Sequence, residues 1–131
     1  MEDDAAAAAG LWSVAGLTRP WNDPVDDFLR AVRGPTSAVF AVKGAEGIIG
    51  TVMAGSDGHR GWVYYLAVAR AHQRLGIASA LMSYAQDWLA QNGAVKIQLM
   101  VRNENAAVLA FYEHLGFETN DVQVLSRWLD A

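Results

Sequence analysis

The segment Gln73-Arg74-Leu75-Gly76-Ile77-Ala78 joins an apolar strand-like run to an apolar helix-like run, and the interpretation of the chain starts from it. Glycine at position 76 allows the backbone to come close to a ligand. The helix predicted to follow begins with amide groups that have no partner inside the helix, and such a helix start binds anionic groups. Taken alone, the segment indicates either a ligand that carries phosphate or a glycine that merely lets helix and strand pack together.

Two other nucleotide-binding motifs fail on individual residues. A dinucleotide-binding fingerprint that starts at Gly76 needs glycine at its sixth position, where this chain has Leu81. It also needs an acidic residue near the end of the next strand, where this chain has Arg102. A P-loop needs Gly-Lys-Ser or Gly-Lys-Thr after the loop, and the sequence has neither here.

Composition limits the classes of protein that remain. The chain has 131 residues, of which 53% are hydrophobic and 18% are charged, and this favours one folded domain over residues 1–131. The net charge of -4 gives no basic field for nucleic acid or for an anionic membrane. The absence of cysteine excludes disulfides and cysteine-metal sites, and no metal is expected. The acidic start and the lack of a long apolar run predict a cytoplasmic protein.

The first half of the chain predicts two helices and three strands. Asp3 or Asp4 is expected to cap the first helix, whose apolar side contains Leu11, Trp12 and Leu17. Two prolines in Arg19–Pro24 end it. The elements predicted here are helices from Ala5 to about Ala15 and from Val25 to Arg33, and strands over Ala38–Lys43, Ile48–Ala54 and Trp62–Ala69, the first two strands joined by a tight hairpin.

In the second half the hydrophobic period changes. Ile77, Leu81, Tyr84 and Trp88 fall on one face of a helix, which Asn92-Gly93 closes. A strand over Val95–Val101 follows, so that the strand–helix–strand unit makes a right-handed crossover between parallel strands. The remaining predictions are a helix from Asn105 to Leu115 with Gly116 left-handed after it, a strand over Val122–Leu129, and core positions for Trp12, Trp62, Trp88 and Trp128. The fold class is therefore α/β, with α+β character in its mixed sheet.

A second motif supports the ligand interpretation of the first. It reads Asn103-Glu104-Asn105-Ala106-Ala107 and leads to Phe111-Tyr112-Glu113-His114-Leu115-Gly116-Phe117. Together the two motifs resemble the coenzyme A signature of the GNAT superfamily of N-acyltransferases, over residues 39–117. Arg19–Pro24, Asp57–Gly61 and Tyr64-Tyr65-Leu66 are similar to small bacterial acetyltransferases of the YpeA type. The ribosomal-protein N-terminal acetyltransferases are a looser match, because Met100 stands where they carry a glutamate base.

The resemblance implies acetyl-CoA as co-substrate and assigns residues to it. Backbone amides of the first motif would hold the pyrophosphate, and the main chain of the preceding strand would bind the pantetheine arm. Asn105 would touch the cofactor as well as cap its helix. The cofactor-binding residues implied in this way are Leu66, Ala67, Val68, Arg74, Leu75, Gly76, Ile77, Ala78, Ser79 and Asn105.

The resemblance also implies direct attack of an amine on the thioester. A backbone amide near Leu66–Val68 would stabilise the oxyanion, and Tyr112 would protonate the departing thiolate, unless Tyr112 is simply an aromatic residue packed under the last helix. A base is needed because an alkyl amine is mostly protonated at neutral pH. Water or one of four loop residues is a candidate: Asp23, Asp57, His59 and Glu104.

The acceptor is not specified by the sequence. Arg19, Trp21, Asp23 and His59 are candidates for its binding site, with Trp21 equally suited to anchoring its loop. A small-molecule or protein amine is expected, including a protein N-terminus, a lysine, a polyamine or an aminoglycoside. The first strand of the GNAT fold is missing from the pattern, so the edge of Ala38–Lys43 is either covered by another chain, as in a homodimer, or left open in a shortened relative. The alternative function is a non-catalytic acyl-CoA-binding module.

Overall fold

The computed structural model describes residues 2–129, which form two compact units that meet at residues 100 and 101. Among the described residues, the first unit contains two short 3-10 helices, three α-helices and four strands, and the second contains one α-helix and an extended segment. The first-unit elements are η1 (Glu2–Asp4), α1 (Ala5–Val14), α2 (Pro24–Arg33), β1 (Ser37–Gly44), β2 (Gly47–Ser56), β3 (Gly61–Val68), η2 (Arg70–His72), α3 (Ile77–Gln91) and β4 (Ile97–Gln98). The second unit contains α4 (Ala106–His114).

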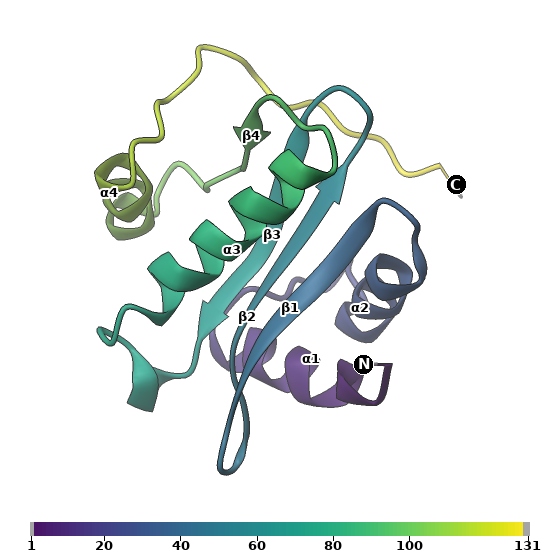
Figure 1. The fold of residues 1–131 in the computed structure, drawn as a ribbon, viewed down its shortest axis with the longest axis vertical. Coiled ribbons are helices and arrows are strands. Elements are labelled where there is room, and N and C mark those ends of the chain that lie inside the picture. The colour runs from purple at the N-terminus through teal and green to yellow at the C-terminus, as the bar shows by residue number, and fades with distance from the viewer. Residues whose placement is uncertain (1, 130–131) are drawn as a thin grey trace. The chain divides into compact units, whose positions relative to one another are not determined.

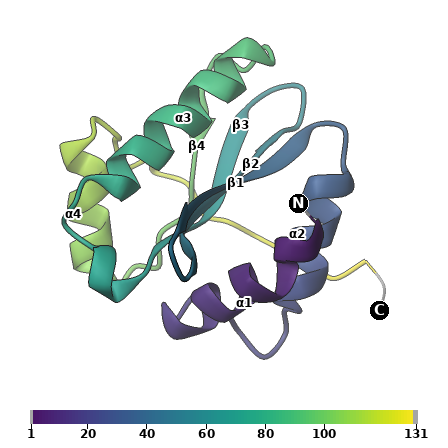
Figure 2. The ribbon, with the colours of Figure 1, turned by 60° about the horizontal axis from the view of Figure 1, so that its bottom comes forward.

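The first unit is built on a mixed sheet with the strand order β1-β2-β3-β4. β1, β2 and β3 are antiparallel neighbours, and β3 and β4 are parallel, which confirms the predicted parallel pair around α3. A two-residue turn, Ala45-Glu46, joins β1 to β2. Helix α3 covers one face of the sheet, and α1 and α2 cover the other (Figures 1 and 2).

Each face of the sheet has its own hydrophobic contacts. Trp12 of α1 and Phe28 of α2 are buried against Ala67 of β3 on one face. On the other face, the buried residues of α3 are Leu81, Met82, Ala85 and Leu89. The buried face of α3 is rotated from the predicted one. Tyr84, which was predicted on the buried face, is 61% exposed and makes an edge-to-face ring contact with Phe40 of β1. The aromatic residue at the margin thus shields the edge strand instead of filling the core.

The ends of the helices follow local chemistry. Asp23 caps α2 by accepting hydrogen bonds from the amides of Val25 and Asp26, with Pro24 at the first helical position. Asn92 ends α3 and is followed by left-handed Gly93, as predicted. The predicted cap on α1 is wrong, because Asp4 stands at the N-cap without a side-chain cap bond and pairs instead with Lys43. The β1 side chain attracts the carboxylate away from the helix start.

Two predicted strands are wrong in extent or existence. The strand over Val95–Val101 is reduced to Ile97–Gln98, and Val95 is 85% exposed. Residues 122–129 form no strand in the part of the chain that the structure describes, and Trp128 is 61% exposed there instead of lying in a core. An apolar, strand-like composition forms a strand only where a neighbouring strand pairs with it.

The predicted absence of a strand before the first helix agrees with the structure of the described residues. Within the described residues η1 and α1 precede β1, and β1 stands at the edge of the sheet. No described helix is both long enough and apolar enough to cross a membrane.

Candidate active site

The predicted anion-binding loop lies between β3 and α3 in the first unit. Gly76 is the N-cap of α3 with φ +79°, and Arg74 is also left-handed with φ +68°. No side chain caps the helix, and within residues 2–100 no hydrogen-bond acceptor meets the amides of Leu75 or Gly76. The first amides of an α-helix have no intrahelical acceptor, so Ile77, Ala78 and Ser79 add further donors to the same place.

The space above this loop is open. A Cβ atom added to Gly76 would meet nothing within 4 Å. Consecutive amides without acceptors at a helix start, where the helix dipole is positive, attract a negatively charged group. The arrangement of the loop is therefore the one expected of an anion site, and no acidic side chain occupies residues 73–79.

Gln73, the first residue of the motif, has a structural task in the first unit. Its side-chain Nε2 donates a 3.2 Å hydrogen bond to the main-chain oxygen of Val68 at the end of β3. The bond ties the loop to the strand. His72 precedes it, and its Nδ1 atom is buried without a hydrogen-bond partner among the described residues.

The edge of β3 that faces β4 is open over most of its length. β4 pairs only with Gly61 and Trp62, and no other described strand pairs with that edge further along. Main-chain groups alternate between the two edges of a strand. Because the amide of Ala69 bonds to Ile49 of β2, those of Val68 and Leu66 point to the open edge. By the same alternation, the main-chain groups of Ala67 point towards β2, like those of Ala69.

A β-bulge precedes this stretch. Thr51 pairs with Ala67, but Met53 pairs with Tyr64, so two residues of β3, Tyr65 and Leu66, oppose one residue of β2. Tyr65 has φ +53°, a left-handed conformation that is uncommon for a tyrosine.

The predicted acceptor residues come from two turns. Arg19, Trp21 and Asp23 lie on the connection from α1 to α2, where Arg19 donates to the carbonyls of Gly16 and Thr18 and Trp21 is 58% exposed. His59 is exposed in the turn between β2 and β3. No hydrogen bond or ion pair within the described chain joins His59 to the other three.

Two of the four candidate bases are engaged as turn or cap acceptors. Asp23 caps α2, as described above. Asp57 accepts hydrogen bonds from the amides of Arg60 (2.6 Å) and His59 (2.8 Å), and these bonds lower the pKa of its carboxyl group. A carboxylate held in this way is a weaker base than a free one.

The second unit contains the two remaining site residues. Asn105 is the N-cap of α4, and its side chain accepts a hydrogen bond from the amide of Val108 (3.3 Å), which confirms its capping role. Tyr112 makes edge contacts with Phe111 and Phe117, at ring-centroid distances of 5.1 and 5.6 Å. Burial raises the pKa of Tyr112 to about 12, so its phenol stays protonated at neutral pH.

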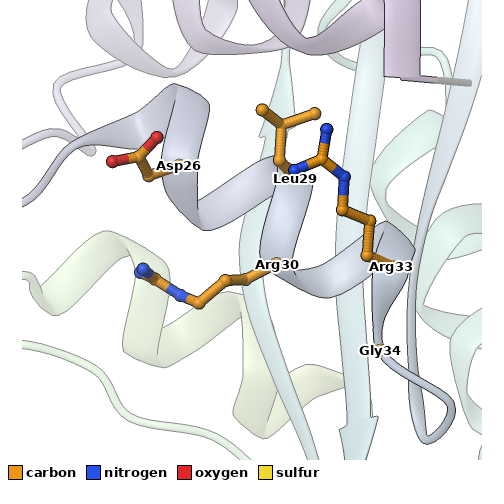
Figure 3. Close-up of a pocket in the computed structure, with 5 residues that line it drawn as sticks. All are labelled: Asp26, Leu29, Arg30, Arg33 and Gly34. Carbon is orange, nitrogen blue, oxygen red and sulfur yellow. The ribbon is translucent and has the colours of Figure 1, made fainter.

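Two hollows in the first unit lie away from the loop and the open edge. One, of about 440 Å³, runs along α2 and is lined by Asp26, Leu29, Arg30, Arg33 and Gly34. Figure 3 shows the side chains of Arg30 and Arg33 pointing in different directions there, and each is paired with a carboxylate, Asp27 and Glu2 respectively. The other, of about 470 Å³, lies along β1 between α2 and α3 and has mainly apolar walls. Asp26 is the one charged residue of the first hollow without an ion pair among the described residues, and a single exposed carboxylate does not identify a ligand.

The sequence did not single out the residues that support the bulge. Thr51 is fully buried and lies between the indole of Trp12 and the carbonyl of Tyr65. The one signal for it was a lone threonine inside an otherwise apolar strand, Ile48–Ala54. Trp12 was predicted only as a core residue.

Comparisons with known proteins agree on one group of relatives. The sequence model of the acetyltransferase (GNAT) family matches residues 7–117. An acetyltransferase of Pectobacterium atrosepticum is 41% identical over 98% of this chain and 91% of its own length. Another, from Sodalis glossinidius, is 40% identical over 94% of this chain and 87% of its own length.

Solved structures show the same fold at low sequence identity. An aminoglycoside N-acetyltransferase in complex with CoA is 17% identical, with a TM-score of 0.81 over 98% of this chain and 90% of the other. An aminoglycoside acetyltransferase from an uncultured soil sample, in complex with sisomicin, is 16% identical, with a TM-score of 0.75 over 97% and 91%.

Proposed function

The chain belongs to the acetyltransferase (GNAT) family, and we propose that it transfers the acetyl group of acetyl-CoA to a primary amine by direct attack. The observation that carries this proposal is the pairing of an open β3 edge with the uncapped loop that follows it. The edge offers main-chain donors for an amide-bearing arm, and the loop offers amides for a pyrophosphate. One ligand that contains both parts in this order is an acyl-CoA.

For the co-substrate we propose main-chain contacts from both elements. The amides of Arg74 to Ser79 would hold the pyrophosphate, in line with their open space and the helix dipole. Leu66 and Val68 would bind the pantetheine arm through the open edge. Ala67, which is buried and paired with Thr51, would support the strand from behind instead of touching the arm. Asn105 is proposed as a further cofactor contact on the strength of the motif alone.

The proposed chemistry moves one acetyl group and one proton. The amine nitrogen forms a bond to the thioester carbon, and the carbonyl electrons move to oxygen, where the amide of Leu66 donates a hydrogen bond worth about 3 kcal/mol. The oxyanion electrons then re-form the carbonyl double bond as the carbon–sulfur bond breaks with its electrons on sulfur, and the nitrogen loses a proton. We propose that Tyr112 donates to the departing sulfur. A phenol with a pKa of about 12 is a weaker acid than a thiol, so the net proton comes from the amine.

The proton that the amine loses needs an acceptor. Because Asp23 and Asp57 already accept main-chain hydrogen bonds, we propose His59, Glu104 or a water molecule in this role. His59 is exposed, and an imidazole ring nitrogen can accept a proton.

We propose a small-molecule amine as the acceptor. Two structural neighbours are aminoglycoside acetyltransferases, and the net charge of -4 suits a cationic amine. Arg19, Trp21 and Asp23 would border the acceptor, since Asn22 of the same connection donates to Asp27, which accepts from the Tyr65 hydroxyl at the bulge. We propose a cytoplasmic location, in keeping with the absence of cysteine.

A second function, acyl-CoA binding without turnover, is favoured by Met100, which stands where related enzymes carry an acid. The two functions share the binding site and differ in catalysis. Binding and turnover must therefore be measured separately.

Calorimetric titration with acetyl-CoA tests the binding part. Gly76→Trp places a bulky side chain in the loop, and Gly93→Trp is a matched control because both glycines are left-handed, flank α3 and have open space above them. We expect the wild type and the Gly93→Trp variant to bind and the Gly76→Trp variant to lose binding. A folded wild type that does not bind acetyl-CoA would contradict both functions.

Release of the CoA thiol with a panel of amines tests the turnover part. We expect release with at least one cationic amine, and Tyr112→Phe should lower kcat by about 10²-fold if the phenol acts on the leaving sulfur. Binding without release for any amine class would favour the non-catalytic function.

A further inference from the structure

We infer that Trp12, Thr51 and Asp27 form a clamp on Tyr65 that positions the main chain of Leu66 and Val68 for the acyl group. This inference rests on the proposed function. The three residues are positioning residues: they act through Tyr65 and touch neither the thioester nor the amine. They come from three different elements of the first unit, α1, β2 and α2.

The inference begins with the left-handed backbone of Tyr65. A non-glycine residue with φ +53° is strained, because its Cβ lies too close to the backbone. Such conformations persist only where the surroundings hold them, and they gather at functional sites. The strain is located at the bulge, just before the residues that face the open edge.

The first hold on Tyr65 is a directional chain of hydrogen bonds. The indole Nε1 of Trp12 donates to Oγ1 of Thr51 at 2.7 Å, and Thr51 donates from the same oxygen to the carbonyl of Tyr65 at 2.9 Å. Trp12 and Thr51 are both 0% exposed. Because an indole only donates, the single proton of the threonine hydroxyl is directed to the Tyr65 carbonyl.

The second hold acts on the side chain. The Tyr65 ring stacks on Trp12, with ring centroids 3.8 Å apart and planes within 9° of parallel. Its hydroxyl donates to Oδ2 of Asp27 at 2.7 Å. Asp27 is in turn fixed by Arg30 at 2.6 Å and Asn22 at 3.2 Å, and its side chain is 16% exposed. Tyr65 is thus held at its carbonyl, its ring face and its hydroxyl.

The bulge decides which amides reach the open edge. Before it, the amide of Gly61 bonds to Lys96, so Gly61 and Val63 face the β4 side. A regular strand would continue this alternation and present residues 65 and 67. One extra residue inverts the alternation, so that Leu66 and Val68 face the open edge instead. The clamp therefore selects the donors that the proposed chemistry uses.

The test compares three variants of the full chain. Thr51→Val removes the hydroxyl and keeps the volume, Thr51→Ser keeps the hydroxyl, and Ser37→Ala is a control. Ser37 donates to the carbonyl of Ala31 at 2.8 Å, a bond of the same kind that does not involve β3. For each variant we would measure kcat, KM and the acetyl-CoA Kd, with folding monitored by circular dichroism.

We expect Thr51→Val to lower kcat by about tenfold to a hundredfold, because a small displacement of a reacting group has an effect of that size. Its acetyl-CoA Kd should rise by a smaller factor than kcat falls, because the pyrophosphate contacts of the loop before α3 stay intact while only the pantetheine contacts of Leu66 and Val68 are disturbed. Thr51→Ser should restore most of kcat, and Ser37→Ala should keep the wild-type value. If Thr51→Val does not fold, Tyr65→Phe, which frees only the hydroxyl end of the clamp, should lower kcat in the same direction.

The outcomes separate the inference from the proposed function. A folded Thr51→Val variant with wild-type kcat, or a loss of kcat that Thr51→Ser does not restore, would overturn the clamp and leave acetyl transfer intact. Wild-type protein that binds no acetyl-CoA would instead remove the proposed function on which the clamp rests.

Discussion

The two halves of β3 differ in how they use the same backbone. The first half, Gly61–Tyr64, is regular, and its beginning pairs with β2 and with β4. The second half, Tyr65–Val68, begins with a strained residue and pairs only with β2 among the described strands. The first half stabilises the sheet through two ladders. The second half lacks the second ladder, so the amides of Leu66 and Val68 on that side have no strand partner among the described residues.

The comparison also shows where each half gets its support. Gly61 is packed so closely that an added Cβ would lie 2.9 Å from Leu89 of α3. The second half is supported from the opposite face, by Trp12 of α1 and Asp27 of α2. The second half of β3 therefore depends on the helices that precede the sheet in sequence, and the regular first half depends on α3.

The largest expected effect is a loss of stability when the packing beneath the second half of β3 is removed. Trp12→Ala removes a fully buried side chain, and we expect the free energy of unfolding to fall by about 3–5 kcal/mol. Urea denaturation measures this change. Trp21→Ala is the matched control, since Trp21 is 58% exposed and its loss should change stability by no more than about 0.5 kcal/mol. Equal effects of the two variants would show that Trp12 does not support the strand.

The next largest effect should be a loss of stability without a loss of activity, caused by a change in the first half of β3. Gly61→Ala forces the methyl group against Leu89, which is 1% exposed, and we expect a loss of about 1–3 kcal/mol. The kcat per folded molecule should stay at the wild-type value, because the bulge is untouched. Gly10→Ala in α1, where nothing lies within 4 Å, should instead gain about 0.5–1 kcal/mol. A fall in kcat for folded Gly61→Ala would mean that the two halves are coupled.

The sequence predicted the regular first half of β3 but not its irregular second half. Alternation and turn residues were enough to place β1, β2, β3 and α3, because each depends on contacts that repeat along its length. The motif from Gln73 to Ala78 was enough to locate the loop, because its glycine has a local backbone role. These predictions needed no knowledge of distant residues.

Predicting the bulge and its clamp requires knowing which residues distant in the sequence contact Tyr65. A positive φ at Tyr65 contradicts its local preference and is imposed by Trp12 and Asp27, which are 53 and 38 positions away in the sequence. The short β4 and the missing strand at residues 122–129 have the same origin: pairing partners decide them, and composition does not. Asp4 was misassigned because Lys43 lies close to it only in the folded chain.

The smallest expected effect concerns the hydroxyl end of the clamp. Tyr65→Phe removes the hydrogen bond to Asp27 and keeps the ring stack, so at neutral pH we expect a loss of about 1 kcal/mol. Burial, followed by the hydrogen bond to Asp27 and the charge of Asp27, raises the pKa of Tyr65 to about 12. The variant should therefore also differ from the wild type in the pH dependence of its stability.

The sign follows from where the phenol loses its proton. In the unfolded chain Tyr65 titrates near its ordinary pKa of 10.0, and in the folded chain near 12, so between these values the folded state holds more protons. The free energy of unfolding is thus at its full value below pH 10 and falls as the pH rises towards 12. Tyr112 adds a fall in the same window, so Tyr65→Phe should reduce the slope without abolishing it. Urea denaturation across that window gives both slopes, and identical slopes would mean that neither burial nor the hydrogen bond to Asp27 raises the pKa of Tyr65 in the folded chain.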